Sequence, residues 1–560
     1  MSLLGRYRLA RDPGLTVANL LDDLLRRNGD REVANGADGP FRLSELHATV
    51  SFLDAFLRRS VGLRPRQPVA IYRSNTRDCF HWFLAVIRAG GIAAPLNPQL
   101  SLPEVRRILT ESGIEVLVTD KAVFERAILD RAALPVRTWI QAENGRDTGH
   151  EQELLDGFVR PAASGPSFPP SAIDPAATIA IFHTSGTSGF PKGAELSSRA
   201  LLGARASTVL ASLLLGPRDL ALVALPWSHI MAVSSALYGL MAGVRGCFLE
   251  RFDVPAALDA IQQFGVTAVI GVPAMFARLV NSHPDPARLA AIRLWLSASD
   301  ELPGEIRDRL RRLGALARLP GGLRIPPMLV NGYGMVELGG LAMLGLELPL
   351  LHGSGSFCFP VPPFRIRVAG EDGRPAPPGR AGECQIWRPG LAPRYWKSEA
   401  ESRALLTADG WLRTGDLAIR NRLGLIRLNG RMKDVIKSGG YSVYAREVEE
   451  AVLAHPAVAR AVVFGLPHPE KGEIPVAAVE LRAESRSAED GLVENRLLET
   501  PLPENRLLEA QLLDWCRSRL APYKAPRRIW IVAPGSLPQN ANGKFLRRVL
   551  QEQFAGKYNG

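Results

Sequence analysis

The residues from His183 to Gly193, HTSGTSGFPKG, have the composition of a loop that handles phosphate groups. Glycine lets the backbone turn tightly and approach a ligand closely, so that successive N–H groups converge on an anion. The Ser and Thr hydroxyls add donors, and Lys192 adds a cation. The spacing is neither that of a Walker A loop nor that of a GxGxxG dinucleotide motif. A solvated turn is the alternative interpretation.

Length and composition place the chain among globular proteins with more than one domain. It has 560 residues, of which 46% are hydrophobic and 22% charged, and this supports a sizeable core. The net charge of +12 comes from Lys and Arg spread along the chain. Without a basic run, nucleic-acid binding is poorly supported. A mild positive field suits small polyanions, and a solvated arginine-rich surface without a role is the alternative.

The cysteines and the apolar stretches indicate a cytoplasmic protein. Five cysteines stand far apart without a CxxC pair, which is typical of a reducing compartment and argues against disulfides and structural zinc. The amino-terminal residues contain no apolar signal core. The uncharged stretch Leu220–Val244 is long enough to span a bilayer, but it contains Pro226 and His229. We expect a buried strand, loop and helix there, and no membrane span.

Alternating short apolar and amphipathic runs indicate a parallel sheet covered by helices. Apolar runs such as PVAIYRS, EVLVTD and LALVALP alternate with helical runs such as DCFHWFLAVIRAGG. Ligands of such sheets bind beyond the carboxyl ends of the strands. HTSGTSGFPKG, SASDEL and NGYGMVE each follow a predicted strand, so we expect them to meet in one crevice. Beyond residue 430 the pattern changes to that of a smaller β/α region.

Two stretches have the composition of surface excursions. The segment Pro161–Pro175 is rich in Pro and Ser, and ENRLLE occurs twice, at 494–499 and 504–509. The repeat is too short for a solenoid. We interpret it as a duplicated polar helical insertion without a catalytic part.

Five motifs occur in the order and at the spacing seen in the adenylate-forming superfamily: TSGTSGFPKG (184–193), NGYGMVE (331–337), DGWLRTGD (409–416), GRMKDVIKSGG (430–440) and NGKFLRR (542–548). Over nearly its whole length the chain resembles acyl-CoA synthetases, adenylation domains of peptide synthetases and beetle luciferases. The resemblance implies an α/β fold with a large amino-terminal domain (1–432) of helix-covered, mostly parallel sheets. It also implies a small mobile α+β domain (433–560), a hinge near Lys433 and a nucleotide at the junction.

The resemblance implies a reaction in two steps with ATP, Mg²⁺ and CoA. A carboxylate attacks the α-phosphate of ATP and releases pyrophosphate, and a thiol then displaces AMP from the acyl-adenylate. The phosphate loop with Lys192 would hold the β- and γ-phosphates, Tyr333 would stack on adenine, and Glu337 would bind Mg²⁺. Asp416 would accept both ribose hydroxyls, and Arg431 would reach ribose or phosphate. The residues expected to bind nucleotide are Thr184, Ser185, Gly186, Thr187, Ser188, Gly189, Lys192, Ala298, Ser299, Asp300, Asn331, Gly332, Tyr333, Gly334, Met335, Val336, Asp416 and Arg431.

The resemblance also implies that each step has its own lysine, because the small domain rotates between the steps. Lys544 would engage the carboxylate and the α-phosphate during adenylation. Lys437 belongs to KSGG, the loop that would then move beside the pantetheine channel with Ser438, Gly439 and Gly440.

Two departures from the family pattern concern the nucleotide. Val336 stands where a Thr usually contacts the AMP phosphate, and Val cannot donate a hydrogen bond. Ala298, Ser299 and Asp300 replace a run close to Gly-Gly-Ala, so added side-chain atoms would narrow the adenine pocket. One alternative is therefore a CoA ligase that acts on a preformed adenylate, and another is an acyl-AMP ligase that loads a carrier protein. A non-catalytic protein on this fold is disfavoured, because the charged motif residues are all present.

The acid is expected to be one without an amino group. Amino-acid-activating relatives pair the substrate ammonium with an Asp, but 220–249 contains neither Asp nor Glu, and an unpaired buried ammonium is costly. His229 resembles a residue that borders the acyl and pantetheine channels. Trp227, Met231, Gly339 and Gly340 are candidates for an apolar acyl pocket, with core packing as the competing interpretation. Aliphatic, aryl and polycyclic acids all remain open.

Overall fold

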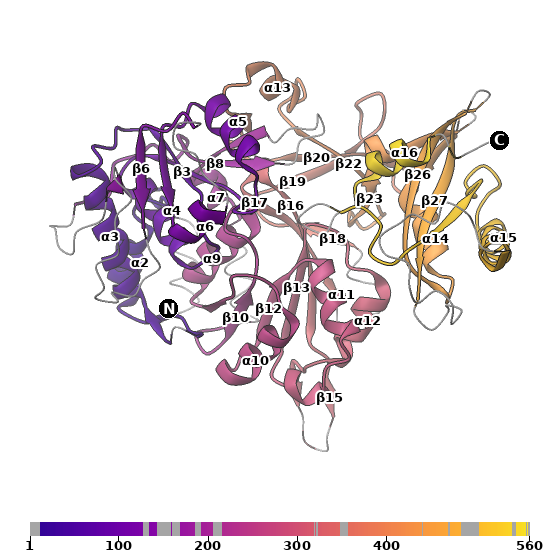
Figure 1. Cartoon of the computed structure of the whole chain (residues 1–560), viewed down its shortest axis with the longest axis horizontal. Helices are drawn as coiled ribbons and strands as arrows, with labels where there is room; N and C mark the ends of the chain where they lie inside the picture. Colours follow the sequence, from indigo (N-terminus) through magenta and orange to yellow (C-terminus); the bar gives the residue numbers. More distant parts are fainter. Residues whose placement is uncertain are drawn as a thin grey trace. The chain divides into compact units, whose positions relative to one another are not determined.

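The computed structural model describes residues 12–37, 39–126, 134–142, 158–159, 168–184, 192–204, 215–318, 320, 323–347, 357–438, 441–468, 471–482, 503–539, 545–555 and 557. The chain divides into two compact units (Figure 1). The larger comprises Met1–Ile366 and Ile386–Leu412, and the smaller comprises Arg367–Gln385 and Arg413–Gly560. The domain boundary at residue 432, the hinge and the junction site stay predictions.

The first sheet of the larger unit carries the phosphate-loop motif. Its strand order is β7-β6-β5-β3-β4-β8-β9-β21, parallel from β7 to β8 and antiparallel at β9 and β21. Alternate residues of β3 face different helices, because side chains alternate across a strand: Val69 packs in the cluster with α2–α4 and Ala70 in the cluster with α5 and α6. The strands are β3 (Pro68–Ile71), β4 (Ile92–Pro95), β5 (Val116–Thr119), β6 (Thr138–Gln141), β7 (Phe158–Val159), β8 (Thr178–Thr184), β9 (Lys192–Ser197) and β21 (Arg394–Tyr395). The helices are α2 (Leu20–Asn28), α3 (Leu43–Arg59), α4 (Asp78–Arg88), α5 (Leu102–Ser112), α6 (Lys121–Arg126), α7 (Ser198–Leu201) and α13 (Glu399–Ala404).

The second sheet of the larger unit carries the NGYGMVE motif. The order is β2-β1-β11-β10-β12-β13-β16-β17-β18, parallel from β1 to β16 and antiparallel at both ends. One face packs on α9 and the other on α10, α11 and α12. The strands are β1 (Glu32–Ala34), β2 (Phe41–Arg42), β10 (Leu220–Val223), β11 (Arg245–Phe248), β12 (Ala268–Gly271), β13 (Leu294–Ala298), β16 (Met328–Met335), β17 (Gly340–Glu347) and β18 (Cys358–Pro360). The helices are α9 (Ile230–Ala242), α10 (Val254–Phe264), α11 (Pro273–Asn281), α12 (Gly304–Arg312) and the 3₁₀ turns η2 (Pro286–Leu289) and η4 (Val336–Leu338), beside the hairpin β14 (Ala317–Arg318) and β15 (Arg324–Ile325).

Two sequence expectations about elements can be compared with these strands. The stretch Leu220–Val244 forms β10, a turn and α9, as expected. In the described residues no helix is long and apolar enough to cross a membrane, and the cytoplasmic location stays a prediction. NGYGM lies within β16 rather than after a strand. The reason is that β17 continues to pair with β16 beyond the end of β13, as far as Met335.

The smaller unit combines strands and helices in an α+β arrangement. Four strands at its start lie in the order β19-β20-β22-β23, and a second sheet has the order β25-β24-β27-β26 with β28 beside β27. Apolar clusters fill both faces of the second sheet. The strands are β19 (Arg365–Ala369), β20 (Ala381–Trp387), β22 (Leu412–Arg420), β23 (Ile426–Arg431), β24 (Val435–Ser438), β25 (Tyr441–Tyr444), β26 (Val458–His468), β27 (Gly472–Leu481) and β28 (Ile529–Val532), and the helices are η6 (Met432–Asp434), α14 (Ala445–Leu453), α15 (Pro503–Arg517) and α16 (Arg547–Phe554). The predicted fold class is confirmed: large, helix-covered, mostly parallel sheets plus a smaller α+β part.

Candidate active site

The phosphate-loop motif connects two antiparallel strands. Thr184 ends β8, and Lys192 begins β9 as its direct partner in the ladder. Five of the predicted phosphate ligands, Ser185–Gly189, lie outside the described residues, so their role stays a prediction. The hairpin therefore fixes both ends of the motif.

The Lys192 side chain contacts both β21 and α13. Its ammonium lies 2.5 Å from Glu401 Oε1 and 5.4 Å from the centre of the Tyr395 ring. The Lys192 contact holds the pKa of the Glu401 carboxyl below its ordinary value. A cation in this position has the charge that triphosphate recognition requires.

Glu337 lies on the η4 turn directly after β16 and is 9% exposed. The Tyr395 hydroxyl donates a hydrogen bond to its Oε1 at 2.7 Å. The described residues contain no group of three or more side chains that could hold a metal ion. Mg²⁺ is commonly bound by one or two carboxylates together with substrate phosphates. The Glu337 carboxylate keeps acceptor capacity for a metal, so the residues fit Mg²⁺ held jointly with ATP.

The predicted adenine run lies at the carboxyl end of β13. Ala298 pairs with Gly332 of β16, and Ser299 has a left-handed backbone with φ 75°. This conformation costs a residue with a Cβ atom roughly 1–2 kcal/mol and is free for glycine. A glycine, which the family pattern has in this run, would adopt this backbone conformation without strain, whereas this chain has Ser299 there. Asp300 turns its carboxylate to the backbone N–H of Glu301 at 2.9 Å.

Two buried polar atoms beside this run have no protein partner. They are Ser297 Oγ and Asn331 Oδ1, on paired residues of β13 and β16. Buried acceptors and donors are normally hydrogen-bonded. Because side chains alternate across a strand, these two atoms lie on the opposite face of the sheet from Ala298 and Gly332, and the nucleotide contact of Asn331 stays a prediction.

Residues Tyr333 to Gly340 comprise the end of β16, the η4 turn and the first residue of β17. Tyr333 is half-buried, and Val336 packs against the main apolar cluster. A Cβ atom at Gly334 would lie 2.0 Å from Gly340 O, and one at Gly339 would lie 2.5 Å from the Ala200 backbone. Gly339 thus permits close backbone packing, and its role in an acyl pocket, like that of Gly340, stays a prediction.

His229 caps the amino end of α9. Its Nδ1 accepts a hydrogen bond from Met231 N at 3.2 Å. Burial lowers the pKa of His229 to about 4. The ring is therefore neutral near pH 7, and with Nδ1 accepting, its proton is on Nε2.

Trp227 and Met231 lie in the core beside His229. Trp227 is 4% exposed and stacks on Phe80 with ring centres 5.1 Å apart. Met231 is 8% exposed, and its sulfur accepts from Ser299 Oγ at 3.8 Å. Both residues pack as core side chains in the described structure, and their contact with an acyl group stays a prediction.

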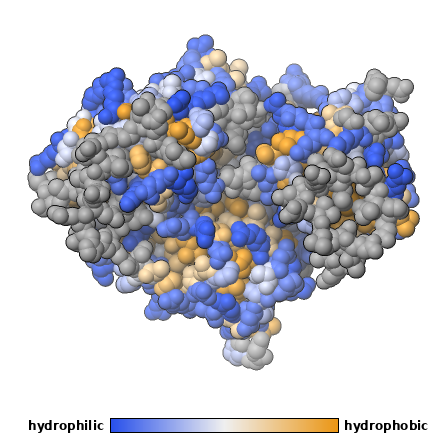
Figure 2. Space-filling view, viewed as in Figure 1, coloured by the Kyte–Doolittle hydropathy of each residue, from blue (hydrophilic) through white to orange (hydrophobic). Residues whose placement is uncertain are grey.

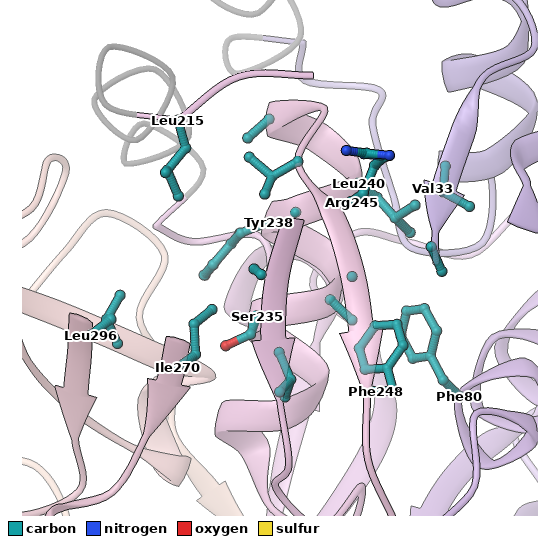
Figure 3. Close-up of a pocket in the computed structure, with 18 of the residues that line it drawn as sticks. Val33, Phe80, Leu215, Ser235, Tyr238, Leu240, Arg245, Phe248, Ile270 and Leu296 are labelled. Carbon is teal, nitrogen blue, oxygen red and sulfur yellow. The ribbon is translucent and has the colours of Figure 1, made fainter. Parts of the chain in front are cut away.

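A cavity of about 180 Å³ lies between α9 and the second sheet (Figure 3). Six side chains in register form its floor, one from each of six neighbouring strands. We call them the apolar row: Phe248, Val223, Ile270, Leu296, Val330 and Leu346. Figure 2 shows an apolar area on this face of the larger unit, over β10, β12 and β13.

The roof of the cavity is a stripe of α9. Ser235, Gly239 and Ala242 line the cavity at a spacing that places them on one helix face. In Figure 3 the Ser235 side chain points toward the cavity beside Ile270. These small residues leave space between the larger α9 side chains of Tyr238 and Leu240, which also line the cavity.

The apolar row leads directly to the predicted nucleotide residues. Ala298 and Gly332 lie two residues beyond Leu296 and Val330 on the same strands, and two residues in a strand span about 7 Å. Because side chains two apart share a face, the floor of the cavity continues to the adenine run.

Asp416 and Arg431 face each other in the smaller unit. They are paired residues of β22 and β23, and Arg431 Nε lies 2.6 Å from Asp416 Oδ1. Asp416 is 9% exposed, and its N–H donates to Thr414 Oγ1 at 3.0 Å. Their nucleotide contacts stay predictions.

The predicted CoA-step residues lie partly outside the described structure. Lys437 and Ser438 belong to β24, where Lys437 N donates to Glu473 Oε2 at 2.8 Å and Ser438 is 5% exposed. Gly439 and Gly440 lie outside the described residues, and so does Lys544, which is predicted to act in adenylation.

Sequence reasoning did not identify Tyr395, Glu401 or the roof of the cavity. Tyr395 and Glu401 lie in a segment without a recognised motif. Their role follows only from the pairing of β21 with β9, which no local pattern predicts. The spacing of Ser235, Gly239 and Ala242 was readable, but small residues on one helix face are also common in packed cores.

Two family models match the chain. The AMP-binding enzyme model covers residues 22–396, and the model of its carboxyl-terminal domain covers residues 447–544. A feruloyl-CoA synthase of an Amycolatopsis species is 30% identical over 499 residues (89% of this chain and 90% of that protein). A sulfoacetate–CoA ligase of Cupriavidus necator is 30% identical over 494 residues (88% of each), and a long-chain-fatty-acid–CoA ligase of Thermus thermophilus is 28% identical over 509 residues (90% and 88%).

Solved structures are similar over almost the whole chain. An ATP-bound RpMatB–BxBclM chimera has a TM-score of 0.79 at 25% identity, covering 97% of this chain and 100% of that one. The o-succinylbenzoate CoA synthetase of Bacillus subtilis with its acyl-adenylate intermediate has a TM-score of 0.74 at 25% identity, covering 95% and 98%. This chain therefore belongs to the AMP-binding enzyme family, as an acid–thiol ligase of its acyl-CoA ligase group.

Proposed function

We propose that the chain activates an apolar carboxylic acid without an amino group as acyl-AMP, using ATP and Mg²⁺, and transfers the acyl group to CoA. The observation that carries this proposal is the apolar row, which runs under α9 to Ala298 and Gly332. An acid whose tail lies on this row has its carboxylate directed toward the predicted adenylate residues.

The lining of the cavity selects against charged tails. Among its described lining residues there is neither Asp nor Glu, so a substrate ammonium would be buried without a partner, at a cost of several kcal/mol. Two arginines lie among the described lining residues. Arg245 is bonded to Glu32 at 2.7 Å, and in Figure 3 its guanidinium points away from the apolar floor. The Arg77 guanidinium lies over the Phe41 ring, 4.1 Å from its centre. An aliphatic or aryl tail fits these side chains best.

Identity to relatives does not choose the acid. The relatives named for feruloyl-CoA and for sulfoacetate are equally similar to this chain, although one acid is aromatic and the other a small dianion. The apolar floor favours the first kind, because burying apolar area contributes about 25 cal/mol per Å².

The charged groups of the larger unit supply what the first step needs. Lys192 would neutralise the β- and γ-phosphates, and Glu337 would hold Mg²⁺, which stabilises charge developing on the phosphates. Neutral His229 would present its Nε2–H near the acyl end without adding charge. Asp416 would accept the ribose hydroxyls, Lys544 would act in adenylation, and the Lys437–Gly440 loop in thiol transfer.

The direct test is to incubate the protein with ATP, Mg²⁺ and a panel of acids, with and without CoA. The panel should contain medium and long fatty acids, cinnamic-type acids, sulfoacetate and α-amino acids. We expect pyrophosphate release with the apolar acids and acyl-CoA only when CoA is added. Acyl-CoA from supplied acyl-adenylate, with no pyrophosphate release from any acid, would contradict the proposal and favour the non-adenylating ligase. Acyl-AMP that CoA does not consume would favour carrier loading.

A substitution in the roof tests the acid class. Gly239→Leu fills the cavity while favouring the helix, and the nearest atom to an added Cβ, Val244 O, is 3.4 Å away. We expect roughly 10- to 200-fold lower kcat/KM for long acids and little change for short ones. Gly304→Leu, on the exposed start of α12, is the matched control. Equal losses for short and long acids would show that the cavity does not hold the tail.

A further inference from the structure

The segment Arg394–Ala404 is bonded to the strand that begins with Lys192. Tyr395 pairs with Ala194 across β21 and β9, and Trp396 N donates to Gly193 O at 2.7 Å. The Trp396 indole donates to Ser112 O at 2.9 Å. The backbone of Tyr395 is therefore fixed beside the hairpin.

Side-chain hydrogen bonds close the turn between β21 and α13. Ser402 Oγ accepts from Tyr395 N at 2.9 Å and donates to Ser398 O at 2.6 Å. Ser398 Oγ donates to Glu401 Oε2 at 3.0 Å. Both Tyr395 and Glu401 are thus oriented by the same short turn.

This turn contacts both charged groups of the phosphate side. Glu401 pairs with Lys192 at 2.5 Å, the Lys192 ammonium lies 5.4 Å from the centre of the Tyr395 ring, and the Tyr395 hydroxyl donates to Glu337 Oε1 at 2.7 Å. A cation at the face of a phenol ring withdraws electron density from it, which strengthens the O–H as a donor. Lys192 therefore lies between the Glu401 carboxylate and the Tyr395 ring, and the neutral Tyr395 hydroxyl links that ring to Glu337.

We propose that Tyr395 is a positioning residue for Glu337. The hydrogen bond from its hydroxyl to Glu337 Oε1 fixes the plane of the carboxylate. The other carboxylate oxygen, Oε2, is then the one that faces the metal. The proposal rests on the proposed function, in which Glu337 binds Mg²⁺ with ATP. Groups that orient a metal ligand typically change metal affinity or activity by 10- to 100-fold when removed.

The test is Tyr395→Phe, which deletes the hydroxyl and keeps the ring. Mn²⁺ is the probe, and its binding in the presence of a non-hydrolysable ATP analogue is followed by electron paramagnetic resonance without acid or turnover. We expect about tenfold weaker Mn²⁺ binding for Tyr395→Phe and a higher Mg²⁺ requirement for pyrophosphate release. Tyr72→Phe is the matched control, since it deletes a hydroxyl that donates to Leu100 O at 2.7 Å.

A double-mutant cycle with Glu337→Gln separates positioning from general stabilisation. If Tyr395 acts through Glu337, the double variant that carries both Glu337→Gln and Tyr395→Phe binds Mn²⁺ no more weakly than Glu337→Gln alone. Two outcomes would overturn this inference and leave the proposed function standing. In one, the losses of Mn²⁺ affinity in the two single variants add in the double variant. In the other, Glu337→Gln weakens Mn²⁺ binding but Tyr395→Phe does not. Unchanged Mn²⁺ binding in Glu337→Gln would overturn the metal role of Glu337 and the inference with it.

Discussion

The half-buried histidine at the start of α9, His229, predicts a specific dependence of stability on pH. The pKa of His229 is lowered by burial from 6.5 to about 4. Below pH 6.5 the unfolded chain therefore binds a proton that the folded chain refuses. Stability due to this residue is complete above pH 6.5 and is lost as the pH falls toward 4.

The magnitude follows from the two pKa values. At about pH 5 protonation of His229 favours the unfolded state about 30-fold, whereas the folded state gains almost nothing from it. The free energy of unfolding is therefore about 2 kcal/mol lower at about pH 5 than at about pH 8. His229→Asn removes the titration and keeps a side-chain oxygen that can cap α9. We expect the pH-dependent loss to be about 2 kcal/mol smaller in this variant.

The assay is urea unfolding followed by tryptophan fluorescence at the two pH values. His283→Asn is the control, because His283 is exposed and has a left-handed backbone that Asn tolerates. The same pH-dependent loss in His229→Asn as in the parent would refute the reasoning, since it would show that the ring is protonated in the folded protein. A smaller loss in His283→Asn would assign the effect to histidines in general.

Two further predictions concern the separate steps and the adenine run. Lys544→Ala should slow adenylation by about 10²–10³-fold while sparing CoA transfer from supplied acyl-adenylate, and Gly440→Ala should do the reverse; equal losses in both steps would assign Lys544 to folding. Ser299→Gly should raise the unfolding free energy by up to about 1 kcal/mol, since relief of the left-handed backbone exceeds the added entropy of the unfolded chain. Lower stability of Ser299→Gly in calorimetry would show that the Ser299 contact with Met231 outweighs the strain.

The alternation of strands and helices could be predicted from the sequence, because apolar residues repeat with a different spacing in a strand than in a helix. Runs such as PVAIYRS and LALVALP became β3 and β10, buried on both faces by helices. The order of the strands was not readable, because it depends on pairing between distant segments. For example, β9 pairs with β21, which lies nearly two hundred residues later in the chain.

The candidate site was predictable where a motif carries its own chemistry. Glu337 and Lys192 were selected from motifs, and the structure gives both a common neighbour in Tyr395. Tyr395 itself could not be selected, because a tyrosine before Trp396 is an ordinary sequence feature. The apolar row was equally hidden: each member is one apolar residue in a buried strand, and only the register aligns them.

The same register links the choice of acid to the place of the chemistry. The face of β13 and β16 that lines the cavity at Leu296 and Val330 carries Ala298 and Gly332 two residues further along the strands. An apolar acid gains free energy from the row only if its tail lies there, and its carboxylate then lies at the end of the row beside Ala298 and Gly332. A short polar acid gains nothing from the row and is not held in that register. Substrate selection should therefore act on kcat as well as on KM, because tail binding orients the attacking oxygen.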